Sequence, residues 1–276
     1  KSFVNLLIVC KLYWMRNFIL ILTIVGLLYS ESTYAIDFGN NLDYIDINSI
    51  KFYNAEGVTF SFQIKNDWSN GHENIFDFGG TPLCSYHTRY MINQDYGYIS
   101  AGIEGQLLDQ AGGPSGSESQ VYFNLNDYNN EWIHVVIIFG LNSSKIYLNS
   151  ELVSINEYDY QGYFDLNDYI IDGVDCSNGN AANIKRIGGN SDNPGNYQFD
   201  GLIDNFTLWS KELTNEQIVN IYNQQTINIE DDNLEGYWKF EEGPDSDILI
   251  DYTANENDGI IYEAMWTTDV PNQFIN

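Results

Sequence analysis

Basic side chains are scarce in this chain of 276 residues, which has 11 Lys and Arg against 39 Asp and Glu. The formal net charge is −28. A nucleic-acid-binding protein needs a basic surface to neutralise phosphates, and anionic membranes recruit basic segments. The charge balance therefore excludes both kinds of partner. Cysteine and histidine are rare as well, with three of each, and they show no zinc-site spacing.

The chain is rich in aromatic residues and glycine, with 21 Tyr, 15 Phe and 23 Gly. Acidic disordered chains lack aromatic and β-branched residues, so this chain is expected to fold. Ala, Lys and Arg, which favour helices, are few. The composition predicts an all-β protein with many turns.

Residues 1–35 have the pattern of a secretory signal peptide. Met15 is a credible start, an apolar run follows at 18–28, and the small residues Thr33 and Ala35 stand at −3 and −1 of a cleavage site. The alternative is a membrane anchor, but the run is short of the roughly 20 apolar residues that a span needs. We therefore expect a secreted or cell-surface protein without a membrane partner after cleavage.

Two cysteines remain beyond the leader, Cys84 and Cys176. In an oxidising compartment an isolated pair more often forms a disulfide than two free thiols. The sequence therefore predicts a Cys84–Cys176 disulfide.

Several runs alternate apolar and polar residues with the period of a strand. These are 44–47, 58–64, 145–149 with 151–153, and 199–209, and the nearly all-apolar run 133–139 is typical of a central strand packed on both faces. Asn149-Ser150 predicts a hairpin turn. One helix is expected over 214–223, with Thr214 and Gln217 as a capping box.

Five segments in order resemble one family. Asp37-Phe38-Gly39 to Tyr44-Ile45 is similar to its "FDG-x-x-DYV" strand, and Val58-Thr59-Phe60-Ser61-Phe62 to its "FTISFWVK" strand. Trp132-Ile133-His134-Val135-Val136, Ile146-Tyr147-Leu148-Asn149-Ser150-Glu151, and Phe199-Asp200-Gly201 to Ile218 match "WHHVV", "IYLNGEL" and "FDGxIDEVxIWxxALSxEEI". The family is the laminin-G-like, concanavalin A-like jelly roll of secreted bacterial proteins. The resemblance implies a two-sheet antiparallel sandwich with one short helix.

A family segment that often precedes the first strand here follows the helix, at 234–266. About forty residues are too few to bury a core alone. Chain termini usually lie close together, so a strand can enter a sandwich from either end of the chain. We therefore predict one domain over 36–276, with 234–266 completing the sandwich as a permuted segment. The alternative is a truncated second copy.

The resemblance also implies a structural calcium. In the family, the Asp of the "GxID" strand lies near a C-terminal turn, and here these are Asp204 and Asp251. Asn255, Asn257 and, less directly, Asp37 complete the expected set of hard oxygen ligands. The alternative is a tight turn held by its own hydrogen bonds.

Catalytic patterns of the fold are missing from the sequence. Glu157-Tyr158-Asp159 begins the Glu-x-Asp-x-x-Glu pattern of retaining glucanases, but Gly162 stands where the second Glu is needed. Two arginines beyond the leader cannot build the arginine triad of a sialidase. His134, inside an apolar strand, is interpreted as a buried sheet histidine. We therefore expect a protein that is not an enzyme, with a divergent glycoside hydrolase as an alternative.

Binding is then the expected function. Sugar sites combine aromatic platforms with planar polar groups, and Tyr158, Tyr160 and Tyr163 form the densest local set. Tyrosines also cover sandwich edges, which is the plainer interpretation of each one alone. The predicted partner is a polysaccharide or other glycan. The alternatives are a cell-surface protein, bound by an adhesion module, and a spacer without a ligand.

Overall fold

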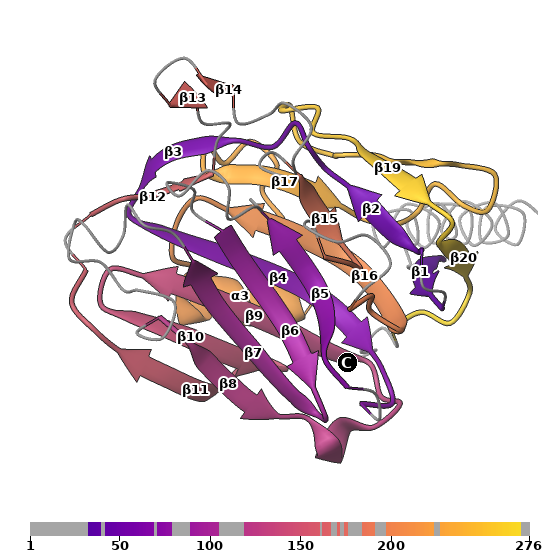
Figure 1. Ribbon diagram of the computed structural model, residues 1–276, viewed down its shortest axis with the longest axis horizontal. Coiled ribbons are helices and arrows are strands. Elements are labelled where there is room, and N and C mark those ends of the chain that lie inside the picture. Colours follow the sequence, from indigo (N-terminus) through magenta and orange to yellow (C-terminus); the bar gives the residue numbers. More distant parts are fainter. Residues whose placement is uncertain are drawn as a thin grey trace, which may run out of the picture. The chain divides into compact units, whose positions relative to one another are not determined.

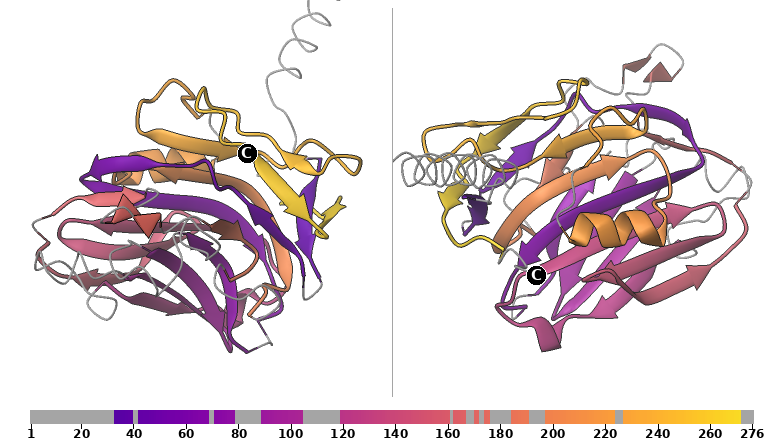
Figure 2. Two further views of the ribbon diagram at one scale, coloured as in Figure 1. Left: turned by 45° about the horizontal axis from the view of Figure 1, so that its top comes forward. Right: turned by 180° about the vertical axis from the view of Figure 1, so that it is seen from behind.

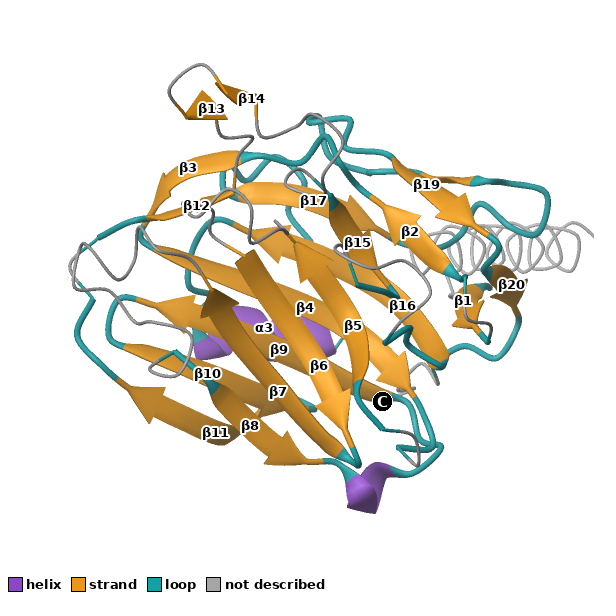
Figure 3. Cartoon of the chain, viewed as in Figure 1, coloured by secondary structure: helices purple, strands orange, loops and turns teal. Residues whose placement is uncertain are grey.

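The computed structural model places two antiparallel sheets face to face (Figures 1 and 3). The residues that it describes are 33–39, 42–68, 71–78, 89–104, 119–160, 162–166, 170–171, 174–175, 184–190, 197–223 and 227–271. The predicted leader up to Ser32 and the predicted Cys84–Cys176 disulfide lie outside these residues. Among them, no helix is long and apolar enough to cross a membrane.

The first eight-stranded sheet has the order β11-β10-β9-β4-β16-β1-β20, with β17 also paired to β16, and is called sheet A. Its eight strands are β1 (Ala35–Phe38), β4 (Gly57–Lys65), β9 (Ile133–Gly140), β10 (Ser143–Leu148), β11 (Glu151–Glu157), β16 (Gly201–Trp209), β17 (Leu234–Trp238) and β20 (Met265–Thr267). β9 is central and wholly buried, as its apolar run predicts.

The second sheet, sheet B, has the order β18-β19-β2-β15-β5-β6-β7-β8. Its strands are β2 (Tyr44–Asp46), β5 (Glu73–Phe78), β6 (Arg89–Asp95), β7 (Tyr98–Glu104), β8 (Val121–Asn124), β15 (Lys185–Ile187), β18 (Ile248–Leu249) and β19 (Gly259–Tyr262). Two small pairs, β3 (Phe52–Ala55) with β12 (Phe164–Leu166) and β13 (Ile170–Ile171) with β14 (Val174–Asp175), and the 3₁₀ turn η1 (Asn126–Tyr128) complete the described elements.

The segment after residue 233 contributes strands to both sheets. β17 pairs with β16 and β20 pairs with β1 in sheet A, while β19 pairs with β2 in sheet B and carries β18 at the edge. β16 is long enough to hold β1 and β17 end to end along one side and β4 along the other. Trp238 of β17 is fully buried in the common core.

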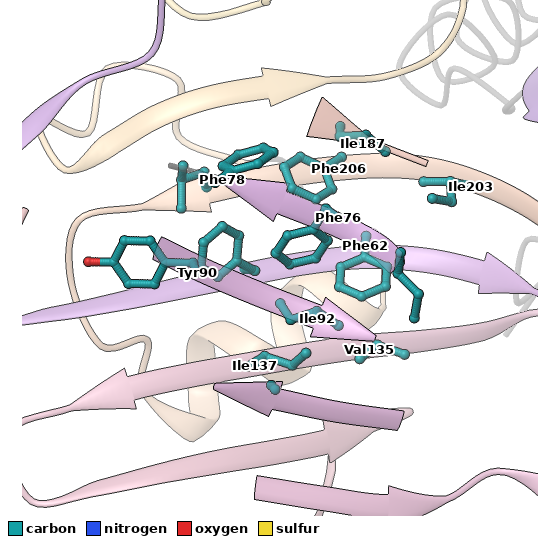
Figure 4. Close-up of a cluster of buried hydrophobic side chains, with 14 of the residues drawn as sticks. Phe62, Phe76, Phe78, Tyr90, Ile92, Val135, Ile137, Ile187, Ile203 and Phe206 are labelled. Atoms are coloured by element: carbon teal, nitrogen blue, oxygen red, sulfur yellow. The ribbon is translucent and has the colours of Figure 1, made fainter. Parts of the chain in front are cut away.

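Aromatic rings fill the space between the sheets (Figure 4). Phe62 and Phe206 of sheet A stack at 5.9 Å, and Phe76 of sheet B meets Phe206 edge-on at 5.5 Å. All three side chains are fully buried. Alternation along each strand turns these rings inward, so the apolar half of each pattern forms the core and the polar half faces outward.

The hairpin and the helix form where the sequence predicts them. Asn149 and Ser150 both have positive φ, 49° and 69°, which suits a tight two-residue turn between β10 and β11. Helix α3 (Asn215–Tyr222) begins after Thr214, and the complete capping box is present. It lies across the outer face of sheet A, where Ile218 is buried (Figure 2, right).

One boundary differs from the expected strand 199–209. β16 begins at Gly201, because the chain crosses between the sheets just before it. Gln198 bridges to Asn74 of β5 in sheet B, and Phe199 packs in the core between the two. The apolar–polar alternation continues through this crossing, so the alternation does not show where the chain changes sheet.

Candidate functional site

The C-terminal loop predicted to bind calcium is held by the carboxylate of Asp251. Its Oδ1 accepts hydrogen bonds from the backbone N–H of Tyr237 at 2.9 Å and of Thr253 at 3.0 Å. Its Oδ2 accepts from the Thr253 hydroxyl at 2.8 Å and the Asn257 N–H at 2.9 Å. Four hydrogen bonds occupy the acceptor capacity of an ionised carboxylate. Asp251 therefore holds the loop in place by accepting hydrogen bonds from N–H and O–H groups of the loop and of β17.

The two asparagines of the loop tie it to β17. The amide nitrogens of Asn255 and Asn257 donate to the carbonyl of Glu235 at 3.2 and 2.8 Å, and Asn255 also donates to the carbonyl of Leu234. Trp238 donates its indole N–H to the Asn257 carbonyl at 2.9 Å. Both side-chain amides therefore present donors to protein carbonyls.

Asp204 lies nearby, on the outer side of β16. It is fully buried and accepts the N–H of Asn205 at 2.8 Å. Tyr237, whose N–H binds Asp251, pairs with Thr207, three residues beyond Asp204 on β16. Burial raises the pKa of Tyr237, and the charge of Asp204 raises it further.

Asp37 of β1 lies apart from that loop, in the pocket described below. Within the described ranges, no three His, Cys, Asp or Glu side chains are grouped to hold a metal ion. The predicted ligand residues, as they stand, fit a self-bonded turn better than a ready calcium ligand set. Calcium binding stays a prediction, and it requires Asp251 to exchange hydrogen bonds for metal bonds.

The three predicted ligand-binding tyrosines have three different environments. Tyr160 is 4% exposed, packs edge-on against Phe164 and donates its hydroxyl to the Tyr163 carbonyl. Tyr158 is half-buried, its hydroxyl lies 3.0 Å from Ser144 Oγ, and burial raises its pKa to about 12. Tyr163 is 56% exposed. Of the three rings, Tyr163 alone offers a broad face to a ligand.

His134 lies on β9, buried beneath helix α3. Its Nε2 is 2.8 Å from the Ser61 hydroxyl, and its ring stacks on Tyr222 of the helix at 5.9 Å. Its Nδ1 has no hydrogen-bond partner. A catalytic Ser-His pair needs a third group that orients the histidine through this nitrogen. The arrangement is that of a structural histidine.

A pocket of about 370 Å³ opens at one end of sheet A. Four neighbouring strands, β4, β16, β1 and β20, supply half of its lining residues, and the loops next to strands supply the other half. The lining residues are Asp37, Lys65, Asn66, Asp67, Asn130, Asp200, Gly201, Leu202, Thr267 and Asp269. Asp37 pairs with Leu202, and Leu202 with Lys65, in one cross-strand row. The flanking residues Ile36, Ile64 and Ile203 point into the core, so this row faces outward.

Hydrogen bonds fix the base and rim of this pocket. Asn66 is 4% exposed, and its amide donates to the Asp200 carbonyl at 2.7 Å while its oxygen accepts the Trp68 N–H. Asp269 accepts from Lys65 Nζ at 2.6 Å and from the indole N–H of Trp132 at 2.9 Å. The pocket is therefore built from side chains that already hold defined positions.

The pocket has an excess of negative charge, because four aspartates and one lysine line it. Burial raises the pKa of Asp37, and the charges of Asp200, Asp43 and Asp269 raise it further. Burial also acts to raise the pKa of Asp269, but hydrogen bonds from Lys65 and Trp132 outweigh it, so that pKa is lowered. Such a pocket offers acceptors to hydroxyl or ammonium groups and repels anions.

Sequence patterns did not identify this pocket. Of its lining, only Asp37 is among the predicted site residues, and there as a metal ligand. The others come from segments more than sixty residues apart, such as 65–67, 130 and 200–202. One signal in the sequence could have pointed to this pocket. Asp200 is an acidic residue directly between the apolar Phe199 and the first residue of β16.

Comparisons with protein families and solved structures identify the fold, whereas comparison with curated proteins gives no match. Among solved structures, a Bacteroides ovatus protein provisionally described as carbohydrate binding has a TM-score of 0.58 at 18% identity, covering 88% of this chain and 62% of its own. This chain thus spans less than two thirds of that protein.

Two further solved structures match this chain with lower TM-scores. The heptameric SAP-like pentraxin of Limulus polyphemus has a TM-score of 0.46 at 13% identity, covering 84% of this chain and 96% of its own. A structure of botulinum neurotoxin type C, reported for its interaction with two ganglioside molecules, has a TM-score of 0.42 at 17% identity and covers 63% of this chain and 38% of its own.

A family model matches residues 38–219, from β1 into helix α3, which is well over half of the chain. The matched residues contribute strands to both sheets. The chain belongs to the concanavalin A-like lectin/glucanase superfamily, of laminin-G type.

Proposed function

We propose that this protein binds glycans without cleaving them, and that the pocket at the end of sheet A binds one sugar unit. The observation that carries the proposal is the pocket itself: about 370 Å³, with carboxylates and amides converging from β1 and from the loops next to β4, β16, β20 and β9. Small-molecule sites are concave, largely pre-formed and provided with a few placed polar groups. The description of the Bacteroides ovatus protein as carbohydrate binding supports the same function.

The charge of the pocket limits the classes of sugar that it can bind. Because aspartates outnumber the single lysine, the pocket suits a neutral or an amino-bearing sugar and disfavours sulfated or uronic sugars. Trp132, held beside the pocket by Asp269, is a half-buried aromatic ring that could lie against a sugar face.

A binding measurement with matched variants tests the proposal. Asp200 has an exposed side chain at the pocket, so Asp200→Ala should weaken binding of a neutral or amino-bearing oligosaccharide about tenfold by calorimetry. Asp232→Ala, on an exposed turn before β17, is the control and should bind as the parent does.

Three results would count against the proposal, of which the first two concern the sugar. One is equal affinity of the Asp200→Ala and Asp232→Ala variants. The other is cleavage of the bound oligosaccharide, seen as new reducing ends, which would favour a divergent glycoside hydrolase. Capture of a cell-surface protein that free sugar does not compete would favour the adhesion alternative instead.

We propose also that the protein acts outside the cell, which the leader pattern of residues 15–35 supports. Structural calcium is a separate proposal, carried by the family resemblance at Asp204 and Asp251. A thermal melt with and without a chelator tests it, because a bound ion must raise the midpoint. Identical midpoints would reject calcium and leave glycan binding in the pocket untouched.

A further inference from the structure

Residues before the expected cleavage point belong to the folded domain. The leader pattern places the cut after Ala35, yet β1 begins at Ala35, which is fully buried and pairs with Thr267 of β20 (Figure 1). A residue that is both paired and buried contributes to the sandwich as the rest of its strand does. A cut after Ala35 would therefore remove the first residue of β1.

The two residues before Ala35 are also held by the C-terminal part of the chain. The Tyr34 ring packs edge-on against Trp266, with ring centroids 6.2 Å apart. The Thr33 N–H donates to both carboxylate oxygens of Glu241, at 2.9 and 3.1 Å, and the Thr33 hydroxyl donates to the same carboxylate. Chain ends are usually poorly ordered unless such contacts hold them. The compact unit that contains the sandwich accordingly begins at Thr33.

The sequence contains a second cleavage point that spares these residues. Signal peptidases require small side chains at the −3 and −1 positions. Ser30 and Ser32 meet that requirement for a cut before Thr33. The cut before Ile36 meets it equally, through Thr33 and Ala35. The small-residue requirement therefore allows both cuts, and only the first leaves β1 intact.

The Glu241 carboxylate suits the chain end that a cut before Thr33 creates. A peptide N–H has one hydrogen to share between two carboxylate oxygens, whereas an ammonium group has three hydrogens and a positive charge. Charge-assisted hydrogen bonds are stronger than neutral ones. Hydrolysis would produce an ammonium group at the Thr33 nitrogen, which already lies within hydrogen-bond distance of both oxygens.

We propose that a signal peptidase hydrolyses the Ser32–Thr33 peptide bond and that the new α-ammonium group of Thr33 pairs with the Glu241 carboxylate. The oxygen of one water molecule bonds to the Ser32 carbonyl carbon, and its two protons go to the Thr33 nitrogen as the peptide bond breaks. The products are a carboxylate on Ser32 and an ammonium group on Thr33. The inference rests on the proposed action outside the cell, because an exported chain meets this class of enzyme.

The test is export of the chain from Met15 onward by a bacterial host, followed by intact-mass measurement and N-terminal sequencing of the product. The product should begin at Thr33. Ser32→Leu, which places a bulky side chain at −1, should lose that product. Unchanged processing of Ser32→Leu, or a parent product that begins at any other residue, overturns the inference and leaves export standing. A chain that is not exported, or that keeps its leader, overturns both the inference and the proposed action outside the cell.

The ion pair has a separate readout, which is the rate of acylation of the α-amine of the processed chain at pH 7. Only the deprotonated amine reacts, and a nearby carboxylate raises the pKa of the amine. Acylation should therefore be about threefold slower in the parent than in Glu241→Gln. Glu230→Gln, at an exposed glutamate before β17, removes the same charge and should react as the parent does. Equal rates in the parent and Glu241→Gln would show that the ammonium group does not pair with Glu241.

Discussion

His134 is the residue whose burial has the clearest measurable consequence. It lies in β9 with its Nδ1 unpartnered, and burial lowers its pKa to about 4 from an ordinary value of 6.5. The unfolded chain therefore takes up the proton at a higher pH than the folded one. Stability contributed by neutral His134 is complete above about pH 6.5 and is lost as the pH falls toward 4.

The corresponding prediction compares two histidine variants. Between pH 7 and pH 4.5 the parent should lose about 2 kcal/mol of unfolding free energy that a folded His134→Gln variant does not lose. His72→Gln, at an exposed histidine, should keep the parent's slope. Urea titrations at each pH measure this, and parallel pH profiles for the parent and His134→Gln would contradict it.

Asp251 is the second residue with a defined consequence, because one carboxylate holds four donors. Asp251→Ala leaves those donors unpaired, and we expect a loss of about 3 kcal/mol in unfolding free energy. Asp232→Ala again serves as the control. A loss below that of the control would mean that the loop is held by something other than this carboxylate.

At the scale of elements, helix α3 shows how a short segment is stabilised locally. Thr214 Oγ1 accepts the Gln217 N–H at 3.3 Å, and Gln217 Oε1 accepts the Thr214 N–H at 2.9 Å. An eight-residue helix is unstable alone, so this cap and the burial of Ile218 on sheet A must sustain it.

Thr214→Ala should therefore destabilise the protein by about 1 kcal/mol, while Thr214→Ser, which keeps the acceptor oxygen, should stay near the parent. Chemical denaturation of both variants measures the difference. An equal loss in the two would show that the threonine methyl group, and not the cap, stabilises this end of the helix.

Local patterns predicted these elements well, and the reason is physical. The alternation in β4 and β9, the turn at Asn149-Ser150 and the capping box are each complete within ten residues. The start of β16 was not predicted, because Phe199 continues the alternation while the chain passes from one sheet to the other. Apolar–polar alternation predicts which side chains are buried, but it does not predict to which sheet a strand belongs.

At the scale of the molecule, the candidate pocket depends on topology. It joins residues 37, 65–67, 200–202 and 269. No short sequence pattern contains this set. For the same reason sequence alone could not separate the buried Tyr160 from the exposed Tyr163, two neighbours in a region without regular alternation.

The strands after residue 233 provide a prediction for the whole molecule. A chain ending at Asn228 lacks four strands and the buried side chains of Trp238, Phe240 and Leu249. We expect it to show no cooperative thermal transition by circular dichroism, whereas a chain ending at Pro271 should melt like the parent. A cooperative melt of the shorter chain at the parent's temperature would support a truncated second copy instead.

The position of β1 has a consequence for synthesis. Ile36 has its two strand partners at Ile203 and Trp266, so β1 pairs with strands that are synthesised long after it. Contacts so distant along the chain form slowly. The sandwich can close only after translation has reached β20. Until β16 has been synthesised β1 has neither partner strand, and a chaperone would have that time in which to bind it.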